Sequence, residues 1–414
     1  MKILWVKPGK ILPLDTGGKL RTYNILRHLS ANHELTYLSY YEGPRDDAYE
    51  REVPTHIPGT TCLVTPALNL SGMKRHLHYL SRITWRAPYA VSKFFDPQVQ
   101  QLLQEWIPQR RFDVAVCDFL SSTLNFPREL ATPTALFQHN VESILWKRKA
   151  DVEPRWIDRA VFTIESAKMF RFEPEQTRRF HHVIAVSETD RQAMSEMVDA
   201  SHISVVPTGV DLSKYRYDPA LRPPGSLVVF TGSMDWQPNI DGVEFFCSEI
   251  WPLVLRKVPQ ARFRIVGRDP HPRVRKLASD SVEVTGTVPS IIDHLREAAV
   301  IVVPLRIGGG TRIKIYEGMA MGKATVSTSV GAEGLDVQHA CDIRLEDSAA
   351  GFAEAVVTLL QNEDARRRLE AAASETARKY DWSVITERFV EVLQKTIAAG
   401  QTKPANPQAT ATKA

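Results

Sequence analysis

The sequence predicts an α/β protein made of two doubly wound domains, each built on a parallel sheet. Its 414 residues exceed one ordinary hydrophobic core and match two domains of roughly 150 to 200 residues each. Short β-branched runs alternate with helical patterns along the chain, and strands separated by helices form parallel sheets. Two such domains joined by one linker leave a cleft between them, and ligands bind where the carboxyl ends of strands meet a cleft.

Short apolar runs mark the predicted strands in both halves of the chain. In the first half they are "KILWV", "DVAVC", "PTALFQ", "HVIAVS" and "ISVVP". In the second half they are "SLVVFTG", "ARFRIVG", "SVEVTG", "VIVVPL" and "KATVSTS". Between the two series, "DLSKYRYDPALRPPGS" is rich in proline and polar residues, which is typical of a connector.

These patterns predict an N-terminal domain at 1–212, a linker at 213–225 and a C-terminal domain at 226–380. The residues after Leu369 have one long helical pattern, and its part at 381–399 is expected to cross back to the N-terminal domain. The polar end of the chain, 400–414, is expected to be disordered.

Composition excludes several classes of protein. The chain is 43% hydrophobic and 24% charged, as soluble globular proteins are, and its net charge of +4 gives no reason to expect a nucleic acid partner. The four cysteines are far apart and form no CxxC pair, which predicts free thiols in a reducing compartment and no zinc site. Without a signal-peptide pattern or an apolar run of about 18 residues, a cytoplasmic location is expected.

One stretch, from Val53 to Phe95, contains no acidic residue but carries Lys74, Arg75, Arg82, Arg86 and Lys93. Its part "MKRHLHYLSRITWR" mixes cations with large apolar side chains, as a helix lying on an anionic membrane does. A solvated basic helix has the same pattern. Two expectations therefore stand for residues 73–93: peripheral contact with the inner face of the membrane, or a solvated basic surface.

The segment "GGGTRIKIYEGMAMGKATVST", residues 308–328, predicts an anion site. It follows the buried run "VIVVPL", and its glycines permit a close approach of the backbone before a helix that Thr311 is expected to cap. Free N–H groups at a helix start attract anions, and Arg312 and Lys314 add cationic donors. A diphosphate fits this arrangement better than a single carboxylate does.

Glu317 shares a helix face with Lys314, and two interpretations of it remain open. A carboxylate only accepts hydrogen bonds, so beside a diphosphate it suits the two hydroxyls of a ribose. It could equally form a helix salt bridge with Lys314. The nearby "GMAMGKA" is not a P-loop, because its spacing is short, Ala324 stands where Ser or Thr is needed, and Gly322 is better placed as a helix end.

The segment "PLRIGGGTRIKIYEGMAMGKATVSTSVGAEGL" resembles the donor site of family 4 retaining glycosyltransferases, which have the GT-B fold. Five further motifs precede this segment in the order that the family has: "VIAVSETD", "VVPTGVD", "VFTGSMDWQPNIDGVEFF", "RFRIVGRDP" and "VTGTVPSI". The resemblance covers nearly the whole chain. It implies two Rossmann-like domains and transfer of a sugar from a nucleoside-diphosphate sugar, with UDP or GDP, to a hydroxyl of a glycan, lipid-linked or small-molecule acceptor. No separate cofactor is implied.

The chain departs from the family pattern at the first of two glutamates that normally lie eight positions apart. Glu317 matches the second, which holds the ribose hydroxyls, while Gly309 replaces the first, which approaches the donor sugar. A related branch that carries "GGGTR" lacks the first acid too. The resemblance therefore implies a variant site, in which the backbone at Gly309 and Gly310 approaches the sugar.

The family also has an Arg and a Lys after the first strand of the second domain, to clamp the diphosphate. Here Ser233 stands there without a base nearby in sequence, so Arg312 and Lys314 are expected to replace that pair. Gly232 is expected to offer its backbone N–H. The positions that match family contacts to the base and ribose are Gly267, Arg268 and Val288.

In the first domain, "LPLDTGGKLRTYNILRHL" resembles the glycine loop that faces the donor phosphates and the acceptor, with Gly17, Gly18 and Lys19 at its tip. A plain turn before a helix would look the same. In "LFQHNVES", His139 follows a predicted strand and matches the family histidine that touches the donor sugar. Without the resemblance, a structural histidine is the alternative.

No DxD pair occurs, so fixed donors, including Arg312 and Lys314, are expected to stabilise the leaving nucleoside diphosphate without a metal. The resemblance implies retention through a front-face route, in which the departing phosphate oxygen helps take the acceptor proton. Two alternatives stay open. One is a catalytically weak subunit that binds sugar nucleotide for regulation, and the other is a sugar-nucleotide 2-epimerase, which has the same architecture.

Overall fold

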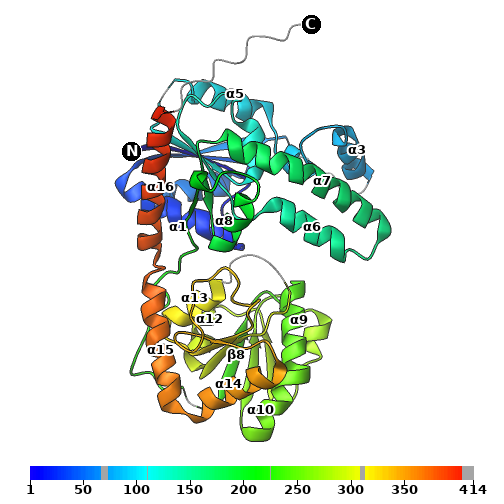
Figure 1. The fold of residues 1–414 in the computed structure, drawn as a ribbon, viewed down its shortest axis with the longest axis vertical. Coiled ribbons are helices and arrows are strands. Elements are labelled where there is room, and N and C mark those ends of the chain that lie inside the picture. The colour runs from blue at the N-terminus through cyan, green and yellow to red at the C-terminus, as the bar shows by residue number, and fades with distance from the viewer. Residues whose placement is uncertain (67–72, 110, 224, 308–312, 403–414) are drawn as a thin grey trace. The chain divides into compact units, whose positions relative to one another are not determined.

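A computed structural model describes residues 1–66, 73–109, 111–223, 225–307 and 313–402 of the chain (Figure 1). The residues form two compact units. The first contains Met1–Pro207 together with the chain from Ile385 onward, and the second contains Thr208–Val384. The predicted linker at 213–225 thus belongs to the second unit. Most of the residues expected to form a disordered tail, 403–414, lie outside the described ones.

The first unit is built on a seven-stranded sheet with the order β3-β2-β1-β4-β5-β6-β7, in which every neighbouring pair is parallel. The strands predicted in the first half of the chain all form, and β2 and β3 are added to them. The strands are β1 (Lys2–Pro8), β2 (Glu34–Glu42), β3 (Thr60–Thr65), β4 (Val114–Asp118), β5 (Thr134–Phe137), β6 (His182–Ala185) and β7 (Ile203–Val205).

Helices connect these strands and cover both faces of the sheet (Figure 1). They are α1 (Gly17–Asn32), α2 (Asp47–His56), α3 (Met73–Arg82), α4 (Tyr89–Ser92), α5 (Pro97–Trp106), α6 (Glu142–Val152), α7 (Trp156–Arg179), α8 (Glu188–Ser195) and the last helix, α16 (Trp382–Thr402). Two short 3₁₀ helices, η1 (Leu120–Asn125) and η2 (Ala200–His202), complete the unit.

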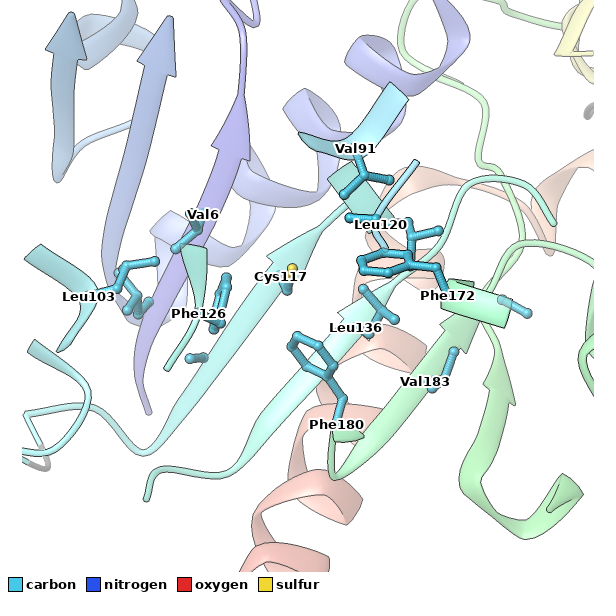
Figure 2. Packing of buried hydrophobic residues seen from close by; sticks show 14 of the residues in the cluster. Val6, Val91, Leu103, Cys117, Leu120, Phe126, Leu136, Phe172, Phe180 and Val183 are labelled. Atoms are coloured by element: carbon cyan, nitrogen blue, oxygen red, sulfur yellow. The ribbon is translucent and has the colours of Figure 1, made fainter. Parts of the chain in front are cut away.

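Apolar packing on both faces explains why the central strands are continuous hydrophobic runs. On one face, side chains of β1, β4, β5 and β6 pack against η1, α4, α5 and α7, as Figure 2 shows for Cys117, Phe126, Leu136 and Phe180. On the other face, Phe389 of α16 stacks on Trp5 with ring centroids 5.3 Å apart. The C-terminal helix therefore supplies part of the first unit's core.

The second unit has a six-stranded sheet with the order β10-β9-β8-β11-β12-β13, again with parallel neighbours throughout. Its strands are β8 (Leu227–Thr231), β9 (Arg262–Val266), β10 (Val282–Gly286), β11 (Val300–Val303), β12 (Thr325–Ser327) and β13 (Arg344–Leu345). Its helices are α9 (Gln237–Phe245), continued by η3 (Phe246–Ile250) and α10 (Trp251–Lys257), then α11 (Pro272–Arg275), α12 (Ile291–Glu297), α13 (Ile313–Ala320), α14 (Ala349–Gln361) and α15 (Glu363–Arg378).

The predicted single helical tail is instead two helices, α15 and α16. The helix is interrupted because the Tyr380 carbonyl accepts a hydrogen bond from the N–H of Val210, at 2.7 Å, and Asp381 then accepts the N–H of Ser383 at the start of α16. α16 also continues to Thr402, so the helix reaches past the predicted end at residue 399.

Both sheets reverse their strand order once, between β1 and β4 in the first unit and between β8 and β11 in the second. Helical connections leave in opposite directions at such a reversal, and this opens a crevice at the carboxyl ends of the two strands. Ligands of doubly wound sheets bind in this crevice. The two reversal points are therefore the places to look for functional side chains.

Candidate active site

Asp118 organises the reversal point of the first unit. It ends β4, is fully buried, and its carboxylate accepts three hydrogen bonds. The donors are the indole Nε1 of Trp5 at 3.1 Å, the hydroxyl of Thr22 at 2.7 Å and Nε2 of His139 at 2.7 Å. A buried carboxylate is stable only when it is satisfied in this way, so Asp118 fixes β1, α1 and the segment after β5 to one another.

His139 has both ring nitrogens engaged. Arg21 lies 2.8 Å from Nδ1, and because a guanidinium only donates, Nδ1 must accept and Nε2 must carry the proton given to Asp118. Burial lowers the pKa of His139 to about 4, although Asp118 opposes the shift. His139 is therefore a neutral imidazole, and a sugar hydroxyl reaches a ring nitrogen only by displacing Arg21 or Asp118.

The glycine loop and His139 lie close together, and both lie against Phe119. The ring of Phe119 stacks on His139 at a centroid distance of 3.9 Å, and a Cβ on Gly18 would lie 2.8 Å from Phe119. Only glycine permits this approach. Gly17 begins α1, whereas the Lys19 ammonium turns to the Asp15 carboxylate at 2.9 Å and the Pro13 carbonyl at 3.3 Å.

Sequence analysis missed three charged residues of this cluster, which are Lys7, Arg21 and Asp118. Lys7 is the last residue but one of β1, is 4% exposed, and its Nζ lies 5.2 Å from the centre of the Phe119 ring, with a pKa lowered by burial. The signal was present: a Lys or Asp that closes an otherwise apolar strand of a two-sided sheet must be satisfied by partners or by a ligand.

In the second unit, Gly232, Gly267 and Lys314 come together at the reversal point. A Cβ on Gly267 would lie 1.6 Å from the carbonyl oxygen of Gly232, and a Cβ on Gly232 would lie 2.8 Å from Nζ of Lys314. Lys314 donates to Oδ1 of Asn239 at 3.1 Å and lies 4.2 Å over the ring of Phe230. Because neither glycine has a side chain, the backbones of Gly232 and Gly267 lie in contact and the Lys314 ammonium lies beside Gly232.

The hydrogen bonding at β8 corrects one expectation. The N–H of Gly232 donates to the Val266 carbonyl at 3.0 Å, because β8 and β9 continue pairing at this point, so it is not available to a phosphate. No acceptor among the described residues faces the next N–H, that of Ser233. The backbone donor of the turn is therefore one position later than predicted.

Ser233 has a base nearby in the fold, although none is near it in sequence. Nε of Arg268 donates to Oγ of Ser233 at 3.0 Å, and Asp235 accepts from the same hydroxyl. Arg268 follows β9, which is remote in sequence but lies beside β8 in the sheet. Arg268 and Lys314 therefore flank the turn after β8, where the family pattern has its Arg and Lys.

Glu317 lies one turn after Lys314 on α13. Its Oε1 accepts a hydrogen bond from the hydroxyl of Tyr215 at 2.7 Å, and Tyr215 comes from the segment predicted as linker. Burial raises the pKa of Glu317, while Lys214 and Lys314 oppose this shift. No hydrogen bond from a described residue reaches Oε2, so that oxygen can accept from a ligand.

The other predicted site residues are placed only in part. Val288 lies in the loop after β10, at the same edge of the sheet and two strands from β8. The predicted residues Gly309, Gly310, Thr311 and Arg312 lie outside the described ones. The rejection of a P-loop at 318–324 is confirmed, because Lys323 donates to the carbonyls of Arg296 and Ala298, at 2.7 and 3.1 Å, inside the unit.

Two further observations concern the part of the chain that the structure describes. It contains no group of three or more His, Cys, Asp or Glu arranged to hold a metal ion, and none of its helices combines the length and apolarity needed to cross a bilayer. The four cysteines are free thiols, as predicted.

Family models match both halves of the chain. The model described as Glycosyltransferase Family 4 matches residues 16–214, and the one described as Glycosyl transferases group 1 matches residues 225–362. The chain belongs to glycosyltransferase family 4. Its two doubly wound units are the Rossmann-like domains of the GT-B fold, as predicted.

Similar family members include two phosphatidyl-myo-inositol mannosyltransferases. The one from Mycolicibacterium smegmatis is 28% identical over 227 residues, and the one from Mycobacterium leprae 29% over 231. Each alignment covers 52% of this chain, and they cover 58% and 60% of the relatives, so the match spans less than two thirds of their length. An uncharacterised 44.6 kDa protein of the Klebsiella pneumoniae cps region is 20% identical and covers 87% of this chain and 91% of its own.

Solved structures share the fold at low identity. Anabaena Alr3699/HepE, in complex with UDP and glucose, is 15% identical with a TM-score of 0.63, covering 95% of this chain and 99% of its own. Sucrose-phosphate synthase from Thermosynechococcus elongatus is also 15% identical, with a TM-score of 0.67 over 96% of this chain and 100% of its own.

The buried hydrogen bonds of His139 predict its titration. A folded-state pKa near 4, below the unfolded value of about 6.5, means that neutral His139 stabilises the native enzyme at pH 7 and that this contribution is lost as pH falls toward 4. The His139 ring signal in NMR spectra of histidine-labelled enzyme, assigned by its loss in His139→Gln, should stay constant between about pH 5.5 and 8. A midpoint near 6.5 would contradict this arrangement.

Proposed function

We propose that this family 4 enzyme transfers a sugar from a nucleoside-diphosphate sugar to an acceptor hydroxyl, with retention of configuration and without a metal ion. The observation that carries the proposal is the arrangement after β8. There, two cations and two touching glycine backbones surround one turn, and a carboxylate acceptor lies one helical turn away. UDP or GDP is the nucleoside diphosphate that we propose.

The diphosphate would lie over the turn at Gly232 and Ser233. Lys314 and Arg268 approach this turn from different strand ends and only donate hydrogen bonds, so together they match an anion. The N–H of Ser233, for which no described residue is an acceptor, adds a backbone donor. Donors fixed in place stabilise the charge that develops as the nucleoside diphosphate leaves, since they need no reorganisation during the reaction.

Glu317 would hold the ribose. Tyr215 fixes one carboxylate oxygen, which orients the other. A carboxylate whose pKa is raised by burial regains stability in its charged form when it accepts hydroxyl hydrogen bonds. Two adjacent ribose hydroxyls supply such donors, whereas the negative charge of Glu317 would repel phosphate. Glu317 therefore suits the ribose, and Lys314 suits the diphosphate.

The proton of the acceptor hydroxyl would go to the departing phosphate oxygen. In the first unit, the candidate bases are already occupied, since Asp118 accepts three hydrogen bonds and each nitrogen of His139 has a partner. Their role is then to shape and position. This supports the front-face route that retains configuration, because the leaving group itself serves as the base.

A lipid-linked glycan is the acceptor class that we favour, since two relatives are named for transfer to phosphatidyl-myo-inositol. The outer face of α3 supports it. Leu77 and Leu80 are 60% and 56% exposed, while His78 packs inward and hydrogen bonds to Tyr89 at 3.0 Å. We propose that this face contacts an anionic membrane.

The fraction of enzyme that floats with phosphatidylglycerol vesicles should be lower for Leu77→Ser/Leu80→Ser than for wild type, because the change removes the two exposed apolar side chains of this face. An unchanged fraction would refute the contact.

The proposed reaction is tested with purified enzyme, UDP- and GDP-sugars and an acceptor extract from bacterial lipid. We expect acceptor-dependent release of nucleoside diphosphate that persists in EDTA, and a product whose anomeric configuration, read by NMR, equals that of the donor. Donor epimerisation without acceptor would identify an epimerase instead. Donor binding with no transfer to any acceptor would identify a regulatory subunit.

In the same assay, Glu317→Ala should raise the donor KM about tenfold or more, because hydrogen bonds to a charged group contribute roughly 1.5 to 3 kcal/mol. Lys314→Ala should lower turnover more than it weakens donor binding, because Lys314 acts on the developing charge. Glu354→Ala, an exposed carboxylate on α14 that pairs with Lys257, is the control and should behave as wild type. Near-normal kinetics in Glu317→Ala would refute the ribose assignment.

A further inference from the structure

A separate pocket of about 430 Å³ lies in the first unit, at the carboxyl ends of β1, β2 and β3. Its walls come from three strand ends and from the chain between α3 and α5. The contacts described so far for donor binding do not involve it. The lining residues that carry its chemistry are Lys10, Tyr41, Glu42, Arg82, Lys93 and Phe94.

Two of the charged groups that line the pocket already have partners. The Lys10 ammonium forms an ion pair with Asp46 at 2.5 Å. The Asp96 carboxylate accepts the N–H groups of Gln98 and Val99, at 2.8 and 3.2 Å, and so caps α5. The ion pair therefore neutralises Lys10, whereas Asp96 is satisfied by hydrogen bonds but keeps its negative charge.

Two further cations of the pocket, Lys93 and Arg82, have fewer hydrogen-bond partners among the described residues than they have donors. The Lys93 ammonium lies 4.8 Å over the ring of Phe94 and makes no hydrogen bond or ion pair within the part of the chain that the structure describes. Burial lowers its pKa and raises the pKa of Glu42, a second acid of the pocket, and the opposite charges of Lys93 and Glu42 oppose both shifts. The Arg82 guanidinium has five N–H donors, of which the described contacts use one, to the Ser92 carbonyl.

We infer that this pocket binds a phosphate group carried by the acceptor sugar. Lys93 and Arg82 match the phosphate oxygens, and the rings of Tyr41 and Phe94 provide apolar walls for a sugar ring. Glu42 and the helix-capping Asp96 oppose these two cations, so the phosphate would be held by the N–H donors of Lys93 and Arg82 and not by a net positive charge. The inference rests on the proposed function and adds that the first unit receives the acceptor.

The position of the pocket suits this role. It surrounds the ends of β1 and β2, whereas His139 follows β5, which is separated from β1 by β4. Neighbouring strands lie about 4.8 Å apart, so the two places are roughly 10 to 15 Å from each other. The loop after β1 joins them, since Gly9 and Lys10 line the pocket and Gly18 lies against Phe119. A phosphate held here would fix the acceptor some distance from the hydroxyl that reacts.

Calorimetry with glucose 1-phosphate, and with glucose as the uncharged comparison, tests the inference in the absence of donor. Wild-type enzyme should bind glucose 1-phosphate more tightly than glucose. Lys93→Met keeps the apolar stem of the side chain and should weaken phosphate binding about tenfold or more. Glu42→Gln removes an opposing charge and should strengthen it, and the exposed Lys2→Ala, at the opposite end of β1 from the pocket, should leave it unchanged.

A second arm measures binding to phosphatidylglycerol vesicles with the same variants. If Lys93→Met weakens and Glu42→Gln strengthens the binding of glucose 1-phosphate, the ligand is a soluble sugar phosphate. If the two variants change only the binding to vesicles, in the same opposite directions, the ligand is a lipid phosphate. Both outcomes support the pocket. Equal behaviour of wild type and both variants in both arms would overturn it.

UDP and GDP binding, measured on the same samples, keeps the two proposals apart. Unchanged nucleotide binding in Lys93→Met confirms that the variant is folded, and with unchanged sugar phosphate binding it overturns only the acceptor pocket. Wild-type enzyme that binds neither nucleotide would overturn the proposed function, whatever the sugar phosphate does.

Discussion

The contact between the backbones of Gly232 and Gly267 is the constraint on which the proposed donor site depends. Two parallel strands, β8 and β9, end side by side, and the Cα of Gly267 lies so close to the Gly232 carbonyl that no side chain fits. This closeness brings Arg268 to Ser233 and leaves room for Lys314 beside Gly232. A bulkier residue at either position would separate the cations from the turn that they flank.

The two units have the same kind of sheet reversal but differ in the charges placed at it. In the first unit, Asp118 collects donors from Trp5, Thr22 and His139, so its reversal point is an internally satisfied polar network. Such a network specifies a rigid arrangement, because each lost partner would leave a buried polar group unpaired. In the second unit, Lys314 and Arg268 flank a turn in which the N–H of Ser233 has no acceptor among the described residues, and this arrangement suits an external anion.

The fold was predictable because apolar strand runs, helical patterns and a polar connector are local signals. Glu317, Lys314 and the glycines were found from a motif whose residues are neighbours in sequence. Two partners that complete them were not found, since Asn239 and Tyr215 reach the site from other elements. Arg268 was expected at the base and ribose, and its contact with Ser233 was not predicted. Spacing along the chain does not encode which strand ends become neighbours until the order of the sheet is known.

A crystal structure of the enzyme with bound UDP or GDP tests the central claim most directly. The account predicts phosphate oxygens within hydrogen-bonding distance of Nζ of Lys314 and the turn at Ser233, and ribose hydroxyls on Glu317. A nucleotide bound at other strand ends, with Lys314 still donating to Asn239 and the turn after β8 without a ligand, would contradict it.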